Sequence, residues 1–249
     1  MNTRNLTHLT AAALLAVQPL LTQAVLGASP AGKQTEPIPM DQLGAAAGKQ
    51  YQGDGLSVTA TPAGARLRCV FQRLEGEVTD EGLWLSSTAE GAKGERFRVV
   101  AVGVGRSREG GRASPRALTS SPLSSPPLPN ESGLARTLAL PGTGKVEVAD
   151  QVARFVRPGL TEEYSVSVDG VRQDFVVWEW PAGAGPLRVD LEITGARAEP
   201  LVNGARLVLD GSGRKLAYSR LRAVDATGKE LPAKMEVQET SAFSLQPFI

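Results

Sequence analysis

The chain has 249 residues, of which 41% are hydrophobic and 21% charged, so it can form one large domain or two small ones around a packed core. Its 27 basic residues nearly balance its 26 acidic ones, which argues against binding to nucleic acid or an anionic bilayer through net charge. The single cysteine excludes an intramolecular disulfide, and the single histidine, His8, lies in the N-terminal leader described next. The rest of the sequence therefore lacks the residues for a Ser-His-Asp triad, a Cys-His pair, a histidine zinc site or a histidine-bound haem.

Residues 1–28 are predicted to be a helical signal peptide that is removed on export. A short head with one basic residue, Arg4, precedes the apolar run LTAAALLAVQPLLTQAVLGA, and small residues at Ala24, Gly27 and Ala28 all fit a cleavage site. A membrane anchor is the rival interpretation, but a proline and two glutamines interrupt the roughly 20 apolar residues that a span requires. Removal of the leader would leave 26 basic and 26 acidic residues. We expect a secreted or cell-surface location, with no stable membrane span after cleavage.

Residues 29–52 are rich in Pro, Gly and Ala and are predicted to be a flexible lead-in. A β-strand segment is expected over residues 53–105, where apolar and polar residues alternate. Cys69 falls on the apolar face together with Phe71, and we interpret it as a buried structural residue because the sequence offers no histidine to activate its thiol. Gly76 is interpreted as a turn or a bulge.

The composition changes sharply over residues 106–133, RSREGGRASPRALTSSPLSSPPLPNESG. Ser, Pro and Gly dominate, and arginines gather in the first half. A segment of this composition buries too little apolar surface to offset the entropy of ordering it, so a disordered linker is predicted. An anion-binding tract of arginines is the alternative. The glycosylation sequon at Asn130 is interpreted as a coincidence.

The alternation resumes over residues 134–240, which are predicted to form the main β-domain, with residues 241–249 as a tail. Dipeptides that favour tight turns separate the apolar runs at Asp169-Gly170, Asn203-Gly204 and Asp210-Gly211. Connections this short join antiparallel strands. The sequence therefore predicts an all-β protein with one or more antiparallel β-sandwich-like domains.

Several short motifs suggest chemistry but have simpler structural interpretations. PGTGKVEV, residues 141–148, lacks the full spacing of a phosphate loop and leads into a strand, so we predict a tight hairpin. The Asp-Gly turns at residues 210–213 and 225–228 carry too few acids for a calcium loop and are interpreted as Asx-type turns. We expect no metal and no cofactor.

Three pairs of acids could serve hydrolysis, because glycosidases use two carboxylates across a cleft. These pairs are Glu75 with Glu77, Glu162 with Glu163, and Asp174 with Glu179. Spacing along the sequence does not show whether two carboxylates face one cleft. Each pair is therefore interpreted as part of a solvated face, and no catalytic residue is assigned.

Trp178 and Trp180 are the candidate ligand-binding residues. Two positions apart, they would share one face of a strand with Val176. A pair of exposed indoles suits stacking on sugar rings or on the prolines of a partner. The alternative is that both indoles cover the edge of the core beside Pro181.

Three stretches resemble a known kind of domain: GLSVTATPAGARLRCVFQRLEGEVTDEGLWLSSTAEG, EEYSVSVDGVRQDFVVWEWPAGAGPLRVDLEITGA and GARLVLDGSGRKLAYSRLRAVDATGKELPAKMEV. They are similar to an N-terminal β-domain of unknown function in large bacterial exported proteins, where it precedes SBBP-type, β-propeller-like or immunoglobulin-like repeats. The likeness covers about residues 53–105 and 134–240 and carries no functional residue. The relatives continue into repeats, whereas this sequence stops at Ile249, which leaves open a short independent form or a truncated reading frame.

Together these features predict a non-enzymatic, exported structural or adhesion-type β-domain, which in longer relatives would precede a repeat array. Its expected partners are other extracellular β-repeat domains or a surface polymer, and nucleic acid is not expected. A carbohydrate- or polymer-binding module that uses Trp178 and Trp180 is the first alternative. An acid-pair hydrolase is the second.

Overall fold

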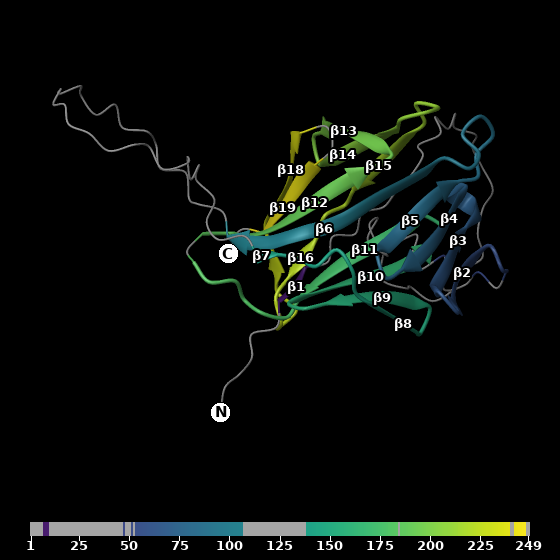
Figure 1. Ribbon diagram of the computed structural model, residues 1–249. Coiled ribbons are helices and arrows are strands. Elements are labelled where there is room, and N and C mark those ends of the chain that lie inside the picture. The colour runs from purple at the N-terminus through teal and green to yellow at the C-terminus, as the bar shows by residue number, and fades with distance from the viewer. Residues whose placement is uncertain are drawn as a thin grey trace, which may run out of the picture.

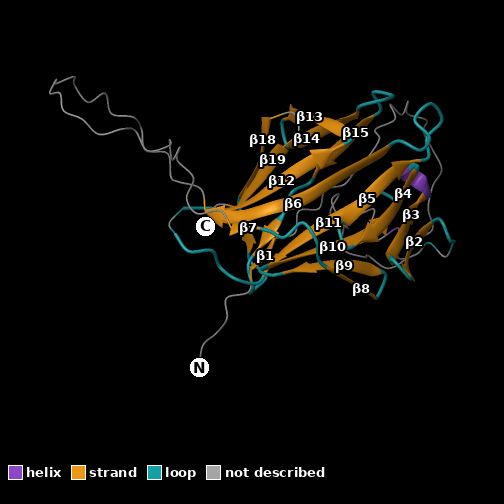
Figure 2. Cartoon of the chain, viewed as in Figure 1, coloured by secondary structure: helices purple, strands orange, loops and turns teal. Residues whose placement is uncertain are grey.

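The chain folds almost entirely into antiparallel strands, as the alternating sequence predicts. A computed structural model describes residues 7–9, 47, 51, 53–106, 138–183, 185–239 and 242–247. A short 3-10 turn, η1 (Val70–Gln72), lies between β3 and β4, and Figure 2 shows strands throughout the layers. The strands form three sheets, each built from antiparallel pairs. The predicted all-β, sandwich-like class is confirmed.

The first sheet has seven strands in the order β17-β16-β1-β11-β10-β9-β8. Its strands are β1 (Thr7–Leu9), β8 (Lys145–Ala149), β9 (Val152–Arg157), β10 (Leu160–Ser167), β11 (Gly170–Val177), β16 (Ala223–Val224) and β17 (Glu230–Leu231). Ser167 pairs with Gly170, so a β10–β11 hairpin forms where it is predicted. Its two turn residues are Val168 and Asp169, however, and Gly170 is the first residue of β11.

The second sheet has nine strands, eight of them in the order β18-β19-β12-β6-β5-β4-β3-β2, with β7 paired to β6. Its strands are β2 (Leu56–Thr61), β3 (Gly64–Cys69), β4 (Leu74–Thr79), β5 (Gly82–Ser87), β6 (Arg96–Arg106), β7 (Leu138–Ala139), β12 (Leu187–Thr194), β18 (Ala233–Glu239) and β19 (Ala242–Pro247). Strands β8 to β10 of the first sheet lie against β2 to β4 of this one, which forms the sandwich (Figure 1).

Strand β6 joins the two halves of the second sheet. Its first residues pair with β5, and the rest of the strand pairs with β12 (Figure 1). The expected segments 53–105 and 134–240 therefore share one sheet through β6 and β12. Arg106 is the last residue of β6 and not the start of the expected linker, whose remaining residues, 107–133, lie outside the described residues.

A β-bulge interrupts the pairing of β6 with β12. Gly103 pairs with Asp190 and Ala101 pairs with Leu191, so Val102 has no opposite residue on β12. The extra residue of a bulge disturbs the hydrogen-bond ladder and leaves backbone groups that need other partners. Leu140 N donates to Val102 O at 2.9 Å, and side chains from the first sheet supply further bonds at Ala101, described below.

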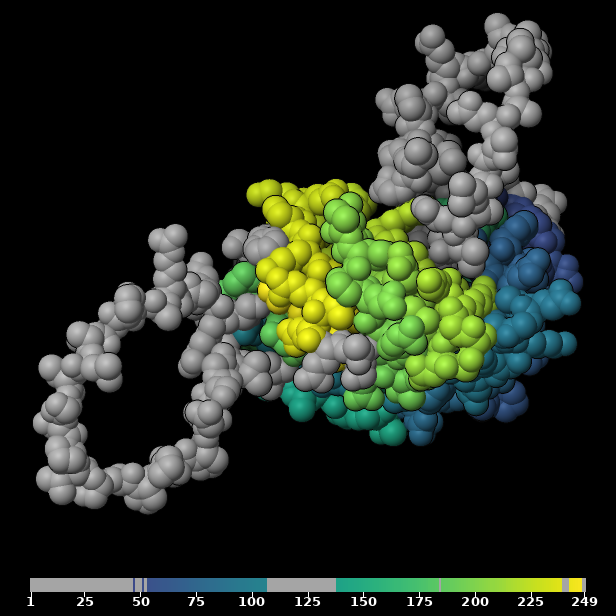
Figure 3. All heavy atoms as spheres, turned by 90° about the horizontal axis from the view of Figure 1, so that it is seen from above, coloured from purple at the N-terminus to yellow at the C-terminus, as the bar shows by residue number. Residues whose placement is uncertain are grey.

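The third sheet contains β13 (Ala196–Leu201), β14 (Gly204–Leu209) and β15 (Lys215–Ser219). Turns connect these strands where they are predicted, and Asp210-Gly211 lies in the turn between β14 and β15. The turn between β13 and β14 consists of Val202 and Asn203, with Gly204 as the first residue of β14. β13 and β14 contact β18, and Figure 3 shows green atoms of this region beside the yellow atoms of the C-terminal strands. The ring centroids of Tyr218 on β15 and Phe243 on β19 lie 4.9 Å apart, which packs this sheet against the second one.

One contiguous hydrophobic cluster draws on all three sheets. Burial of apolar side chains provides most of the free energy that holds such a fold together. Its largest fully buried side chains are aromatic: Tyr164, Tyr218, Phe97, Phe155, Phe175 and Phe243. Cys69 is also fully buried, as predicted.

Several local expectations are wrong because tertiary pairing overrides short-range patterns. Residues 242–247 of the expected tail form β19, which lies between β12 and β18. Residues 141–144 do not form a hairpin, because β7 pairs with β6 whereas β8 pairs with β9. Phe71 lies in η1 and is 50% exposed.

Gly76 lies within the continuous strand β4 and not at a turn or bulge. A Cβ atom at this position would lie 2.9 Å from Leu83 Cδ1 and 3.2 Å from Leu67 Cβ. The glycine therefore allows close packing of neighbouring core side chains in the middle of the sheet.

The described part of the leader is a strand. Thr7–Leu9 form β1, which pairs with β11 and β16, whereas residues 10–28 of the expected signal-peptide helix lie outside the described residues. The expected lead-in, residues 29–52, is likewise described only at Ala47 and Tyr51. Within the described residues, no helix has the length and hydrophobicity needed to cross a bilayer.

Candidate functional site

Trp178 follows the end of β11 and is held by two hydrogen bonds. Its backbone N donates to Gly159 O at 3.0 Å, and its indole Nε1 donates to Thr161 Oγ1 at 2.8 Å. The side chain is nevertheless 51% exposed. The polar edge of the indole is thus fixed to the sheet, while much of its apolar ring is open to solvent.

Trp180 lies two residues further along the same loop and is 41% exposed. Arg106 Cζ lies 4.0 Å from the centroid of a Trp180 ring, which is a cation–π contact. The same guanidinium donates from Nε to Pro181 O at 3.2 Å and from Nη1 to Gly185 O at 2.7 Å. Arg106 therefore ties the loop to the end of β6 and holds the second indole in place.

We call residues 178–180, which carry the exposed indoles of Trp178 and Trp180, the tryptophan loop. The structure corrects the expected geometry, because β11 ends at Val177 and the two indoles do not share a strand face with Val176. Their exposure also argues against the alternative that both cover the edge of the core. Rings that are held in place and exposed can stack on a flat apolar surface of a ligand without a further loss of side-chain entropy.

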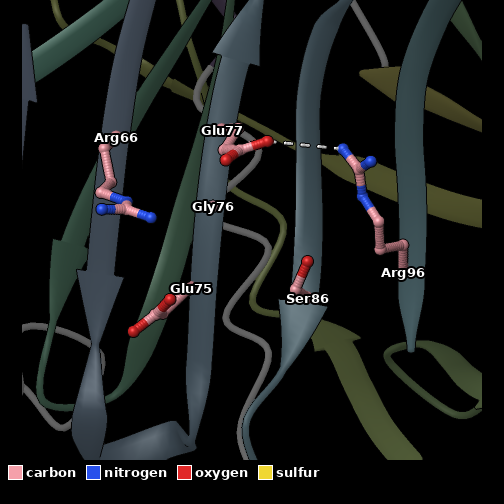
Figure 4. A pocket seen from close by; sticks show the side chains of 6 residues that line it. All are labelled: Arg66, Glu75, Gly76, Glu77, Ser86 and Arg96. Atoms are coloured by element: carbon pink, nitrogen blue, oxygen red, sulfur yellow. Dashed lines mark ion pairs between the residues drawn. The ribbon is translucent and has the colours of Figure 1, made fainter. Parts of the chain in front are cut away.

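The acidic pair Glu75 and Glu77 lies on the outer face of β4. Together with Arg66, Gly76, Ser86 and Arg96, they line an open depression of about 240 Å³ (Figure 4). Figure 4 shows Glu77 turned toward Arg96 and Glu75 turned to the opposite side of the strand. The two carboxylates share a strand face but diverge, and no cleft encloses them as a glycosidase would require.

Basic side chains neutralise this outer face. Arg96 Nη2 lies 3.7 Å from Glu77 Oε2 in an ion pair whose two side chains are more than half exposed. The guanidinium carbons of Arg96 and Arg98 lie 5.1 and 4.9 Å from the centroid of Trp84 on β5. Two arginines therefore contact this third tryptophan, whereas Trp180 has one such contact, with Arg106.

Glu162 is the centre of a buried polar network that bridges the first two sheets. Its Oε1 accepts hydrogen bonds from Arg157 Nη2 and from Ala101 N, the latter at 3.1 Å. Its Oε2 accepts from Tyr164 Oη at 2.9 Å and from Gln173 Nε2 at 2.5 Å. Both carboxylate oxygens are thus engaged by donors from the chain itself.

The network extends into the bulge of β6. Arg157 Nη1 donates to Ala101 O at 2.8 Å and to Pro141 O at 3.1 Å, and the guanidinium lies over the ring of Phe155. Gln173 Nε2 also donates to Val99 O at 3.2 Å. Side chains of β9, β10 and β11 thereby pair backbone groups of β6 near the bulge, so the bridge has a structural role.

Burial raises the pKa of the Glu162 carboxyl, and the Arg157 charge, Tyr164 and Gln173 oppose this rise. The side chains of Arg157 and Glu162 are 2% and 0% exposed. No substrate can reach a carboxylate enclosed in this way. Glu163, its expected acidic partner, points away from this network and forms an ion pair with Arg154 at 2.7 Å.

Asp174 is not paired with Glu179, which follows β11 in the tryptophan loop. It forms an ion pair with Arg172 at 2.8 Å and lies opposite Glu163 on β10. Burial raises the pKa of Asp174 to about 6, and the Arg172 charge only partly opposes this rise. The two acids of neighbouring strands each have an arginine partner, so neither is set up as a free acid or base.

The remaining candidates have structural roles. Asp225 Oδ1 accepts from Thr227 N at 2.8 Å and from Lys229 N at 3.0 Å, as expected for an Asx-type turn. Cys69 Sγ lies 3.4 Å from Ser167 O, and burial raises the pKa of its thiol to about 11. In the part of the chain that the structure describes, no group of three or more His, Cys, Asp or Glu residues could hold a metal ion.

Sequence reasoning missed the residues that organise these sites, Arg106, Arg157 and Thr161. The alternation contained a signal for one of them: Ala153, Phe155 and Arg157 share the inward parity of β9, as Leu160, Glu162 and Tyr164 do on β10. Two opposite charges at inward positions of neighbouring strands predict a buried pair. Comparison with protein-family models, curated proteins and solved structures gives no match for the chain.

Proposed function

We propose that this chain is a non-enzymatic, exported β-domain of structural or adhesion type, which binds through its tryptophan loop. The observation that carries the proposal is the exposure of Trp178 and Trp180, which are 51% and 41% accessible although hydrogen bonds and a stacked arginine hold them. Large exposed apolar side chains are typical of binding surfaces. The resemblance to domains that precede extracellular repeats supports the same role.

The polar chemistry of the described residues supports a structural role for the acids. Glu162 bridges two sheets, Asp174 and Glu163 have arginine partners, and Glu77 pairs with Arg96. General acid–base catalysis needs a carboxyl that can reach the substrate and exchange a proton with it. These carboxylates instead connect strands or balance positive charges on the surface.

A polysaccharide is the ligand class that the tryptophan loop favours within this proposal. Sugar rings present flat faces of C–H groups, which stack on indoles. Arg106 occupies a face of Trp180, and its polar contacts anchor the loop backbone. A repeating polymer could place successive rings on the two indoles, so that two weak contacts act together.

The test measures retention of the full chain on insoluble polysaccharides after expression with export in a bacterial host. We expect the Trp178→Ala, Trp180→Ala double variant to lose binding by about tenfold or more, because each stacked ring contributes on the order of 1 kcal/mol. Trp84→Ala is the matched control, since Arg96 and Arg98 cover that indole. Equal retention of the double variant and the wild type would refute the role of the loop.

Export is tested by the N-terminus of the protein recovered outside the cytosol. Mass spectrometry should find a new N-terminus after Ala24, Gly27 or Ala28. Recovery of the intact chain from the cytosol alone would contradict export, and polysaccharide binding can then be measured on that intact chain.

A further inference from the structure

Strand β1 occupies a slot between two other strands of the first sheet (Figure 1). Thr7, His8 and Leu9 lie opposite Val177, Val176 and Phe175 of β11. On its other side, His8 pairs with Val224 of β16. β11 and β16 are thus joined within the sheet order by three residues that belong to the predicted leader.

The register of the β10–β11 hairpin shows which backbone groups of β11 face the slot. Ser167 and Gly170 flank a two-residue turn and therefore form a hydrogen-bonded pair. Hydrogen-bonded pairs recur at every second residue, so Arg172, Asp174 and Val176 direct their N–H and C=O groups to β10. Phe175 and Val177 then direct theirs to the slot. Trp178 N, which donates to Gly159 O on the β10 side, agrees with this alternation.

Each wall of the slot also has contacts other than those with β1. Phe175 and Val177 belong to the hydrophobic core, and Ala223 of β16 is fully buried. β16 is also held by its own hairpin with β17, which an Arg222–Glu230 ion pair at 3.1 Å and the Asp225 turn support. The walls would therefore present two strand edges with unpaired backbone groups.

We infer that this slot is an acceptor for a strand of a partner polypeptide, which replaces Thr7–Leu9 once the leader is cleaved. The inference rests on the export and cleavage proposed above. The residues of β11 that lie opposite the partner, Phe175, Val176 and Val177, are apolar and buried. The partner therefore fits as an extended, uncharged segment of an exported protein that runs antiparallel to β11, as β1 does. Main-chain hydrogen bonds would supply the affinity, as in other cases of strand addition. Proline is excluded opposite Phe175 and Val177, since it lacks the N–H that the slot accepts.

This acceptor slot is continuous with the tryptophan loop. Val177 at the end of the slot directly precedes Trp178. Because the strand is antiparallel, the residues that precede it in the partner lie at the Trp178 end of β11. A partner strand would thus enter beside an exposed aromatic side chain, which adds apolar contact to backbone pairing.

The experiment follows amide hydrogen exchange by NMR in the full-length chain and in the same chain after leader removal. A protease recognition site placed after Ala28 removes the leader in vitro, so the test does not depend on natural export. We expect the amides of Phe175 and Val177 to exchange at least about tenfold faster after removal. The amides of Arg172 and Val176, which face β10, should keep their protection and serve as controls in the same strand.

A synthetic peptide with the sequence of residues 5–10, NLTHLT, is the probe for strand addition. It should restore the protection of Phe175 and Val177 in the cleaved chain, whereas the peptide NLTHPT should not, because proline replaces the residue opposite Phe175. Protection of these amides in the cleaved chain without peptide, through its own residues or a second copy, would overturn the inference. Loss of protection at the control amides as well would also overturn it, because the slot would then collapse when emptied.

Discussion

The Arg157–Glu162 and Arg96–Glu77 ion pairs each connect two different strands, yet their surroundings give them different consequences for stability. The side chains of Arg157 and Glu162 are 2% and 0% exposed, whereas those of Arg96 and Glu77 are 51% and 59% exposed. In the buried pair every carboxylate oxygen also accepts bonds from other donors. The exposed pair has water as its alternative partner.

The comparison teaches that burial, rather than the identity of the charges, determines how much an ion pair contributes to the stability of the fold. Water screens an exposed pair, and holding two long side chains together costs entropy. A buried pair is expensive to desolvate, but the loss of one partner leaves an uncompensated charge in the core. The interior pair should therefore dominate the response to mutation, and the following predictions are ordered by expected effect.

Glu162→Gln should have the largest effect on stability. The variant leaves the buried Arg157 guanidinium without its counter-charge, so the free energy of unfolding should fall by about 3–5 kcal/mol. Denaturant unfolding followed by circular dichroism measures this change. As a control, Arg157→Met combined with Glu162→Met should cost less than the sum of the two single variants, because neither unpaired charge remains. Additive losses would mean that the two residues act independently.

Asp174→Asn should change the pH dependence of stability. The folded carboxyl has a pKa of about 6, above its ordinary value near 3.8, so between these values the folded state binds more protons than the unfolded state. Stability from this group is therefore greatest at low pH and falls as pH rises through about 6, by about 2–3 kcal/mol in total. Relative to the variant, the wild type should gain stability between about pH 7 and about pH 4 in thermal or denaturant unfolding. Parallel pH profiles would contradict the raised pKa.

Glu77→Gln should have little effect on stability. The exposed pair with Arg96 is screened by water, so the change in unfolding free energy should stay below about 1 kcal/mol and shrink further with added salt. The measurement is the same as for Glu162→Gln, so the losses of unfolding free energy in the two variants can be compared directly. A fall in the free energy of unfolding close to that of Glu162→Gln would show that solvent exposure does not determine how much the two ion pairs contribute to stability.

The Cys69 thiol should be unreactive while the protein is folded. Burial raises its pKa to about 11, so the thiolate that reacts is scarce at neutral pH and is shielded by the core. Labelling with a chromogenic disulfide reagent should be slow in buffer and fast in denaturant. Rapid labelling of the folded chain would show that the core around β3 opens readily.

Particular residues show how far the sequence could predict the structure. Hairpins near Asp169-Gly170, Asn203-Gly204 and Asp210-Gly211 were predictable because turn chemistry is local, although Gly170 and Gly204 begin the following strands. The connection over residues 141–144 was not predictable from the sequence. The strand before it pairs with β6 of the second sheet, whereas the strand after it pairs with β9 of the first sheet. The tryptophan loop was recognised as a pair of aromatics, but its place after the end of β11 and its contact with Arg106 depend on the assembled sheets.

The sequence by itself determined the antiparallel all-β class, most of the hairpin turns and the burial of Cys69, because alternation and turn chemistry act over a few residues. Only the tertiary structure decided that Glu162 bridges two sheets, that residues 242–247 form an interior strand, and that Thr7–Leu9 join β11 to β16. The physical reason is that a strand has two edges and two faces, and the partners of each are chosen by chain segments far away in the sequence.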